Sequence, residues 1–273
     1  MADNPTDWFR QLFPRLAEGC DLAPEQMRLA VGELIAGRFA EWEAAAFLTA
    51  LRVKGETGAE IAAAAAVLRE RMVRLEAGGR EVLDTCGTGG DGSGTFNVST
   101  AAALVAAGAG VPVVKHGNRS VSGRSGSADV LRELGVPVEA GPEWAARCLE
   151  RTGFAFCFAP HFHPAMANVA ALRRKLGVRT LFNLLGPLAN PAGARYQLIG
   201  VGREELLPRL AEALARLGTR RAFLVYGRDG TDEVSLSAPN RVIEVSEGRL
   251  SETEWTARDF GLEPCGREAL CAE

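Results

Sequence analysis

The strongest chemical signal in this sequence is a glycine-rich segment, residues 84–100, between a predicted strand and a predicted helix. Glycine in a strand-to-helix turn lets backbone N–H groups point into one hollow, where the helix dipole also favours anions. The spacing matches neither the dinucleotide fingerprint nor the P-loop. Helix capping would account for one of the polar side chains at the helix start, not for four, so we predict a phosphate site. Those four residues are Thr95, Asn97, Ser99 and Thr100.

A second loop, residues 115–127, gathers cations and hydroxyl groups after the next predicted strand. Lys115, Arg119 and Arg124 stand there among glycine and serine residues. Ligands of open α/β sheets bind at the C-terminal ends of the strands, which is where this loop is placed. The alternative is an ordinary solvated basic loop. The glycine, asparagine and serine residues between these cations favour a ligand-binding loop.

An adjacent pair of carboxylates, Asp232 and Glu233, could ligate Mg²⁺. This hard cation prefers oxygen ligands and often shares its coordination shell with phosphate. The pair follows Asp229-Gly230, and Asp-Gly is a common turn, so the pair alone is a weak signal. Two phosphate-type loops elsewhere in the chain strengthen the prediction of a magnesium site.

A histidine pair and two arginines form the last group of chemical interest. His161 and His163 have no third ligand nearby, and His116 is the only other histidine, so we do not predict zinc. The loop is better explained as a pocket lining. One of Arg173 and Arg174 could meet a substrate carboxylate with its planar guanidinium, while the other lies on a solvated helix face.

The first 75 residues or so are predicted to be helical, because apolar residues recur at helical spacing. One helix starts near Pro24 and ends at Gly37, and a second runs from about Glu41 to Lys54. A third places Ile61 to Leu75 on one face and is predicted to end at the glycine pair 78–79.

From residue 81 onward, short apolar runs alternate with helical patterns, which predicts crossover connections and a mainly parallel sheet. Beyond residue 227, segments 233–236 and 241–245 are predicted to pair as a hairpin. The predicted strands of the alternating region are Val82–Thr85, Val111–Lys115, Phe154–Phe158, Gln197–Val201 and Ala222–Tyr226.

Composition restricts the class of protein. The chain has 273 residues, a formal net charge of −3, 47% hydrophobic and 24% charged residues, which excludes general disorder and argues against nucleic-acid or membrane partners. The uncharged stretch 92–114 is interrupted by polar residues and glycine, so we predict a buried helix and strand rather than a membrane span. The six cysteines form no C-x-x-C pair and no signal peptide is visible, so we expect a cytoplasmic protein.

Five motifs in this order resemble the anthranilate phosphoribosyltransferase family of tryptophan biosynthesis, over the chain up to about residue 249. They are G-T-G-G-D…T-F-N-x-S-T, K-H-G-N-R-S-V-S, H-P-A-M, F-N-L-L-G-P-L-x-N-P at 182–191, and the Asp232-Glu233 pair. The resemblance implies a small helical domain, 1–78 with part of 164–190, and a larger α/β domain, 79–273. It also implies a homodimer.

The resemblance implies transfer of the phosphoribosyl group of 5-phosphoribosyl 1-diphosphate (PRPP) to anthranilate, with two Mg²⁺ ions. It places the metal on Ser99, Asp232 and Glu233, and anthranilate on Gly87, Asn118 and Arg173, which selects Arg173 over Arg174. The residues implied for PRPP are Gly87, Gly90, Asp91, Thr95, Asn97, Val98, Ser99, Thr100, Lys115, His116, Gly117, Asn118, Arg119, Ser120, Val121, Ser122, Gly123 and Ser127.

No catalytic acid, base or nucleophile is assigned. No G-x-S-x-G motif appears, and Cys86 is best explained as a small buried residue. The anthranilate amine is neutral at pH 7, so it needs no base before attack, and His116 is a candidate by location only. Lys115 and the metal would stabilise charge on the leaving diphosphate.

Two other functions remain open on the same scaffold. A nucleoside phosphorylase is one, although the intact K-H-G-N and H-P-A-M motifs argue against it. A nucleic-acid-binding protein is the other, and the net charge of −3 argues against that. Family members usually continue past residue 273 with further helices, so we expect apolar sheet surface to be exposed at the C-terminal end.

Overall fold

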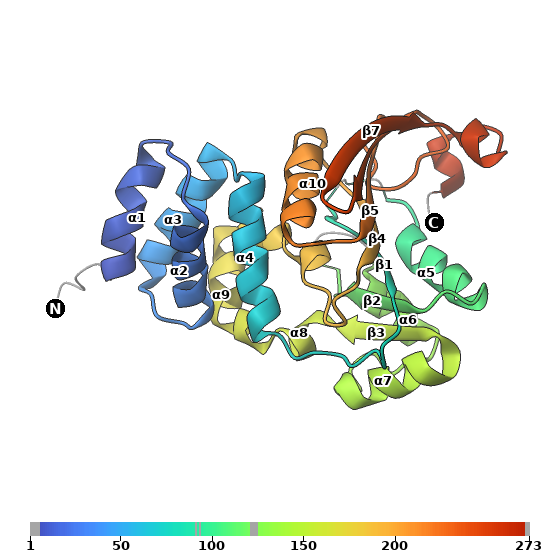
Figure 1. Cartoon of the computed structure of the whole chain (residues 1–273), viewed down its shortest axis with the longest axis horizontal. Coiled ribbons are helices and arrows are strands. Elements are labelled where there is room, and N and C mark those ends of the chain that lie inside the picture. The colour runs from blue at the N-terminus through green and yellow to red at the C-terminus, as the bar shows by residue number, and fades with distance from the viewer. Residues whose placement is uncertain (1–5, 91, 93, 121–124, 271–273) are drawn as a thin grey trace.

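Apolar spacing in the first seventy residues produces a bundle of four helices, seen on the left of Figure 1. The computed structural model describes residues 6–90, 92, 94–120 and 125–270. The bundle helices are α1 (Asp7–Ala17), α2 (Pro24–Ile35), α3 (Glu41–Lys54) and α4 (Gly58–Arg71). A capping box starts α4, because the Thr57 hydroxyl accepts from the Glu60 N–H and the Glu60 carboxylate accepts from the Thr57 N–H.

The third predicted helix, which is α4 in the structure, does not extend to the glycine pair as predicted. Helix α4 ends at Arg71, and Met72 has an extended backbone with ψ of 154°. Apolar periodicity continues to Leu75, but that side chain packs with Val82 and Val114 under the sheet instead of in the bundle. The chain thus leaves the bundle earlier than the glycines indicate.

The second part of the chain forms a seven-stranded sheet in the order β3-β2-β1-β4-β5-β6-β7. Strands β1 to β5 pair in parallel, as predicted, and β6 and β7 add two antiparallel strands at one edge. The strands are β1 (Leu83–Gly87), β2 (Val113–Gly117), β3 (Phe154–Phe158), β4 (Tyr196–Gly200), β5 (Arg221–Gly227), β6 (Asn240–Ser246) and β7 (Arg249–Trp255).

The predicted hairpin between segments 233–236 and 241–245 is wrong. Residues 233–236 are not a strand, and β6 pairs instead with the following strand, β7. The connecting turn has positive φ at both Glu247 (47°) and Gly248 (81°), the backbone of a two-residue type I′ hairpin. Segment 233–236 is consequently available to cross the end of the sheet, where the candidate site lies.

Helices cover both faces of the sheet around β2 and β3. Alternate residues of β3 point to opposite sides, so Phe154 and Phe156 pack in one cluster while Ala155 and Cys157 pack in another. The covering helices on the Phe154 side are α5 (Val98–Gly108) and α6 (Ser127–Glu133), and those on the other side are α7 (Gly141–Thr152) and α8 (Ala159–Phe162).

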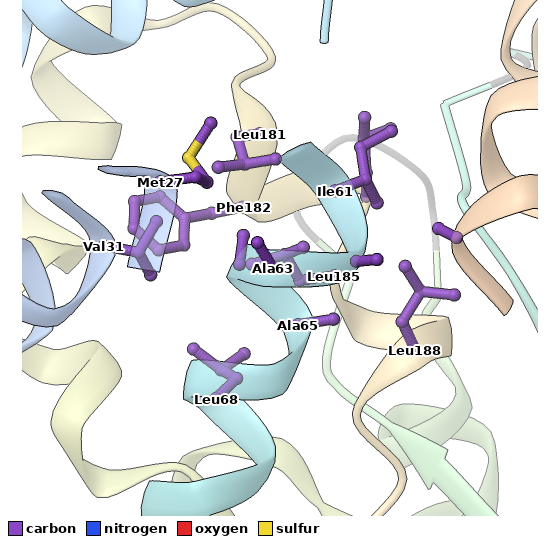
Figure 2. Packing of buried hydrophobic residues seen from close by; sticks show 14 of the residues in the cluster. Met27, Val31, Ile61, Ala63, Ala65, Leu68, Leu181, Phe182, Leu185 and Leu188 are labelled. Carbon is purple, nitrogen blue, oxygen red and sulfur yellow. The ribbon is translucent and has the colours of Figure 1, made fainter. Parts of the chain in front are cut away.

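The bundle and the sheet share one hydrophobic core. Helix α9 (Ala167–Leu176) and the segment 181–189 lie between the two parts, and α10 (Leu207–Arg216) packs on the sheet beside α4. Figure 2 shows Met27 and Val31 of α2 next to Phe182, with Leu185 and Leu188 beside α4. These side chains belong to a cluster that extends from Trp8 to Val245. We therefore expect that neither the bundle nor the sheet is stable without the other.

An apolar hollow of about 700 Å³ lies on the sheet face that carries α5. Strands β4 and β5 contribute Leu198 and Phe223 to its lining, and Trp255, Phe260 and Leu262 are among its other apolar residues. Among the described helices, none is long and apolar enough to span a membrane. The uncharged stretch 92–114 contains α5 and the start of β2, but the prediction of a buried helix is wrong, because only Thr100 and Ala103 of α5 are buried.

Candidate active site

Glycine residues end four neighbouring strands of the parallel sheet, and the carboxylate pair packs against two of them. Gly87 of β1 lies directly opposite Gly200 of β4 in the sheet. A Cβ atom on Gly200 would lie 1.5 Å from the Asp232 carbonyl oxygen, and one on Gly87 would lie 2.8 Å from Asp232 Oδ2. The missing side chains let Asp232 sit on the ends of both strands. The structure therefore joins two motifs that lie far apart in the sequence.

The glycine-rich turn is held by hydrogen bonds from three directions. The Thr88 N–H donates to the Gly200 carbonyl (2.9 Å), and the Gly202 N–H donates to the Thr88 hydroxyl (3.0 Å). Asp232 Oδ2 accepts from the Gly89 N–H at 2.9 Å. On the opposite side, Arg179 donates to the carbonyls of Thr88 (2.8 Å) and Gly89 (2.6 Å). The turn is thus fixed before any ligand arrives.

Lys115 lies at the floor of the site. Its side chain is buried, and its ammonium donates to the Thr85 carbonyl and to the Ser99 hydroxyl, the latter at 3.1 Å. Burial lowers the pKa of Lys115, while the carboxylates of Asp84 and Glu233 act in the opposite direction. A buried ammonium bound to the first turn of α5 and to the end of β1 can bind an anion that enters between them.

Behind Lys115, a buried network connects β1, β2 and the segment 186–190. Asp84 accepts from the His116 N–H (3.2 Å) and from the Asn190 side-chain amide (2.8 Å), which also donates to the Val114 carbonyl. Burial raises the pKa of Asp84 to about 6, and Lys115 opposes that shift. This network orients the strand that carries Lys115 without reaching the open part of the site.

His116 is placed in this network and is unsuited to acid–base work at neutral pH. Its Nδ1 is 2.9 Å from the Gly186 carbonyl, so Nδ1 carries the proton and Nε2 does not. Nε2 is buried and has no hydrogen-bond partner among the described residues. Burial, with the neighbouring His163 ring at 4.9 Å, lowers the pKa of His116 to about 3. The ring thus lies in the buried network behind Lys115, and the imidazole is a weak base.

The donor set proposed for magnesium consists of oxygen atoms from two elements. Ser99 is the second residue of α5, and Asp232, followed by Glu233, lies against the ends of β1 and β4. Ser99 Oγ already accepts from Lys115, and Glu233 interacts electrostatically with the same ammonium. In the described part of the chain, no three His, Cys, Asp or Glu side chains cluster as a complete metal site. Two carboxylates and a hydroxyl suit Mg²⁺ that completes its shell with phosphate oxygens and water.

Arg173 is better placed than Arg174 to bind a carboxylate. It lies in the last turn of α9, with its guanidinium carbon 5.7 Å from the centre of the Phe182 ring. Burial lowers the pKa of Arg173, whereas the Arg174 side chain is exposed. The half-buried guanidinium beside an aromatic ring is a suitable partner for a planar, negatively charged aromatic molecule.

The basic loop after β2 folds back on the start of α6. Asp129 accepts from the N–H groups of Ser120 (3.1 Å) and Gly126 (2.9 Å), and the Asn118 carbonyl accepts from the Ser127 hydroxyl. Gly117 is in close contact with that hydroxyl, since a Cβ there would lie 2.1 Å from it. Arg119 pairs with Glu139, outside the loop. Four predicted PRPP residues lie outside the described residues: Asp91, Val121, Ser122 and Gly123.

Some predicted PRPP residues have local roles at the start of α5. The buried Thr100 hydroxyl donates to the Asn97 side chain (2.5 Å), and the Asn97 carbonyl accepts the first helical bonds. Val98, the first residue of α5, lines the apolar hollow. The Asn97 side chain makes no capping bond to a backbone N–H of α5, so its bond to Thr100 fixes the two side chains at the helix start. Thr95 lies half-buried ahead of this turn, and Gly90 is exposed with φ of 77°.

Sequence reasoning missed three residues that build this site. Arg179 holds the glycine-rich turn, and Asp84 and Asn190 form the network behind Lys115. Asn190 stands in the F-N-L-L-G-P-L-x-N-P motif, so the motif itself was a usable signal. Asp84 begins the glycine-rich segment. Nothing in the sequence near Arg179 indicates that it reaches a loop 90 residues earlier.

Family models match nearly all of the chain. The helical bundle domain of a glycosyl transferase family matches residues 10–72, and the a/b domain of a glycosyl transferase family matches residues 79–273. Among curated relatives, the anthranilate phosphoribosyltransferase of Roseiflexus sp. (strain RS-1) is 50% identical over 94% of this chain and 75% of its own length. That of Rhodopirellula baltica is 46% identical, over 100% of this chain and 80% of the relative.

Solved structures agree with these relatives. Anthranilate phosphoribosyltransferase from Thermus thermophilus superposes with a TM-score of 0.90 at 46% identity, over 98% of this chain and 78% of that one. The Saccharomyces cerevisiae enzyme, solved in complex with PRPP and Mg, has a TM-score of 0.84 at 30% identity, over 97% of this chain and 77% of that one. With sequence, fold and site in agreement, this chain belongs to the anthranilate phosphoribosyltransferase family.

Proposed function

We propose that the protein transfers the phosphoribosyl group of PRPP to the amino group of anthranilate, yielding N-(5-phosphoribosyl)anthranilate and diphosphate. The observation that carries the proposal is the meeting of the glycine-rich turn, buried Lys115 and the Asp232-Glu233 pair at one edge of the sheet. Backbone N–H groups, an ammonium and carboxylates for a cation are the groups that a magnesium diphosphate requires. The yeast relative was solved with PRPP and Mg, which supports the assignment.

The PRPP site is proposed to consist of the turn at Gly87–Gly90, the start of α5 and the loop after β2. Ser99, Asp232 and Glu233 would hold two Mg²⁺ ions. Bound there, the metal would supply positive charge that stabilises the diphosphate leaving group. Lys115 adds a fixed ammonium whose position costs no reorganisation during the reaction, because its hydrogen bonds to Thr85 and Ser99 already hold it.

Anthranilate is proposed to bind between Gly87, Asn118 and Arg173. The Arg173 guanidinium would pair with the carboxylate, beside the Phe182 ring. The relative from yeast was also solved with 4-fluoroanthranilate, an analogue of this substrate. Because the amine is neutral at pH 7 and His116 is a weak base, we assign no general base. Positioning of the two substrates is then the main contribution of the protein.

We also propose that the enzyme is a homodimer in the cytoplasm, as the family resemblance implies. An apolar groove of about 550 Å³ on α1 and α3 supports self-association. Val53 on this surface is 82% exposed, and Phe13 and Ala46 line the groove. The same face of a second copy would cover it with two-fold symmetry. Analytical ultracentrifugation should give the mass of two chains, and the mass of one chain would refute the proposal.

The activity is tested by following anthranilate fluorescence. Purified protein with PRPP, anthranilate and Mg²⁺ should consume the fluorescent substrate and release diphosphate in equal amounts. When PRPP is omitted or Mg²⁺ is chelated, the anthranilate fluorescence should stay constant. A folded protein that leaves the fluorescence unchanged with all components present would refute the proposed function.

A further inference from the structure

The guanidinium of Arg179, which is distant in sequence, holds the glycine-rich turn by two hydrogen bonds. Arg179 lies between α9 and the short 3₁₀ turn Leu181–Asn183. Its Nη1 donates to the Gly89 carbonyl (2.6 Å) and its Nη2 to the Thr88 carbonyl (2.8 Å). The guanidinium is half-buried, and burial lowers its pKa. A planar fork that binds two successive carbonyls fixes the orientation of both peptide groups, which a single-point donor cannot do.

By fixing two carbonyl groups, Arg179 also fixes the direction of the N–H groups in the same peptides. The Thr88–Gly89 peptide is held at both ends, by Arg179 on the carbonyl and by Asp232 on the N–H. In the next peptide, Arg179 holds the Gly89 carbonyl. Because a trans peptide is planar, the Gly90 N–H points away from Arg179. Arg179 thus directs a backbone donor of the proposed diphosphate site without contacting the ligand.

Gly90 shows how closely the guanidinium is packed. A Cβ atom on Gly90 would lie 1.7 Å from Arg179 Nη1 and 3.0 Å from Cζ. The backbone of Gly90 has φ of 77°, which already disfavours any other residue. The positive φ favours glycine at this position, and a methyl group there would displace the end of the Arg179 side chain.

The segment that carries Arg179 also contacts the proposed anthranilate side. Arg173 lies in the last turn of α9 and over the ring of Phe182, which is three residues after Arg179. The Asn183 side chain accepts from the Thr180 N–H at 3.0 Å and closes the turn between them. A short, hydrogen-bonded segment thereby connects the arginine proposed for anthranilate with the turn proposed for PRPP.

We propose that Arg179 is a positioning residue, which holds the Thr88–Gly90 backbone in the form that binds diphosphate and couples it to the segment beside Arg173. The inference rests on the proposed function. The charged groups near Arg179 are Asp232, Arg52 and Arg203. The Asp232 carboxylate favours the positive charge of Arg179, whereas the two arginines disfavour it. Loss of the clasp leaves the chemistry intact but lets the turn adopt conformations that bind PRPP poorly.

The test compares Arg179→Ala and Arg179→Lys with wild type in steady-state kinetics for both substrates. We expect Arg179→Ala to raise the KM for PRPP at least about tenfold with a smaller effect on kcat. Arg179→Lys keeps the charge but loses the fork, so its KM should lie between those of Ala and wild type. Free guanidinium, well below the concentration that unfolds the protein, should lower the KM of Arg179→Ala. The surface change Arg216→Ala serves as the matched control.

The outcomes separate this inference from the proposed function. A wild-type protein without activity refutes the function, whereas an active wild type with an unchanged KM for PRPP in both variants overturns the role of Arg179. A fall in kcat alone, without rescue by guanidinium, would mean a merely structural role and would also overturn it. If Arg179→Ala fails to fold, the KM of Arg179→Lys decides, because lysine retains the charge and most of the buried stem.

Gly90 offers a second, independent measurement. Gly90→Ala should raise the KM for PRPP strongly in wild type, since the methyl group displaces the guanidinium. In the Arg179→Ala background the same change should cost less, because only the backbone strain remains. A double-mutant cycle measures this coupling directly. Strictly additive effects on the KM would contradict the packing of Arg179 against Gly90.

Discussion

At the scale of single residues, the proposed active site depends on ionisable groups whose charge is set by burial. Lys115 and Asp84 are both buried, one facing the site and the other behind it. Burial disfavours the charge on each, and their mutual attraction partly offsets that cost. The polar network around them keeps the ammonium in place. Burying the ammonium costs free energy, but the positive charge is then already in position when a diphosphate binds.

Arg173 is the residue whose change should separate the two substrates. We expect Arg173→Ala to weaken anthranilate binding about 10- to 100-fold, because a charge-assisted hydrogen bond contributes about 1.5–3 kcal/mol. PRPP binding should change little. Fluorescence titration of anthranilate measures the effect, and Arg174→Ala on the exposed face of the same helix is the control. Equal anthranilate affinity for wild type and Arg173→Ala would contradict this role.

His116 should make folding stability depend on pH. Its pKa is lowered from 6.5 to about 3 in the folded protein, so the stability it contributes is fully present above pH 6.5 and is lost as the pH falls toward 3. Between pH 7 and pH 5 the free energy of unfolding of wild type, measured relative to His116→Gln, should fall by about 2 kcal/mol. Urea titrations at both pH values measure it.

The comparison with His116→Gln removes contributions that both proteins share. Asp84 has the opposite tendency, because its pKa is raised to about 6 and acid therefore favours the folded state. A difference between the two proteins that stays constant from pH 7 to pH 5 would show that the imidazole is not held neutral. Activity of wild type should show no ionisation of His116 between pH 6 and pH 8, for the same reason.

At the scale of elements, the site exists because strand ends lack side chains. The segment 231–233 crosses β1 and β4 where Gly87 and Gly200 end them. Neither of these glycines has a positive φ, so close approach alone explains them. The parallel arrangement brings the two strand ends to the same edge, and the glycines let a third segment lie on top.

Gly200→Ala should test that close approach. The new methyl group would lie 1.5 Å from the Asp232 carbonyl oxygen, so the carboxylate pair must move away. We expect the Mg²⁺ concentration for half-maximal activity to rise at least about tenfold, together with a lower melting temperature. Both are measured on the purified variant.

Gly108→Ala is the matched control for this change. Gly108 is the last residue of α5, a Cβ there meets nothing within 4 Å, and its φ is not positive. Alanine should leave the Mg²⁺ requirement unchanged and add up to about 1 kcal/mol of stability. If Gly200→Ala behaved like Gly108→Ala, the segment 231–233 would not need the glycine.

At the scale of the whole molecule, bundle and sheet are joined rather than merely adjacent. The shared core passes from α2 and α4 through the segment 181–189 to α10 and the sheet (Figures 1 and 2). Arg69 of α4 strengthens the joint, because it donates to the Leu188 carbonyl at 2.6 Å. The segment that positions Arg173 and Arg179 is thus built into the core of both parts.

Unfolding of the whole chain should therefore be one transition. Leu188→Ala removes a fully buried side chain at the joint and should cost about 2–5 kcal/mol, without splitting the transition. Circular dichroism and tryptophan fluorescence during thermal unfolding should coincide, with Leu29→Ala, on an exposed position of α2, as the control. Two separated transitions would mean that the bundle and the sheet unfold independently.

The fold was predictable where local pattern and tertiary packing agree. The parallel strands before residue 228 follow from short apolar runs between helical patterns, and Phe154–Phe158 is placed to the residue. The hairpin is misplaced because β7 is a solvent-facing strand with few apolar residues, while 233–236 alternates polar and apolar residues as a half-buried strand does. The end of α4 was misplaced because Leu75 keeps helical spacing yet packs under the sheet.

The sequence by itself determined the chemistry of this protein. Its five motifs identify the family, and residue type alone points to phosphate, a hard cation and a carboxylate. Tertiary structure decided which of these residues meet and in what state of charge. Asp232 reaches Gly89, and Arg179 clasps Thr88, only because the sheet and the shared core bring distant segments together. The pKa values of Asp84 and His116 depend on burial, which is a property of packing and not of local sequence.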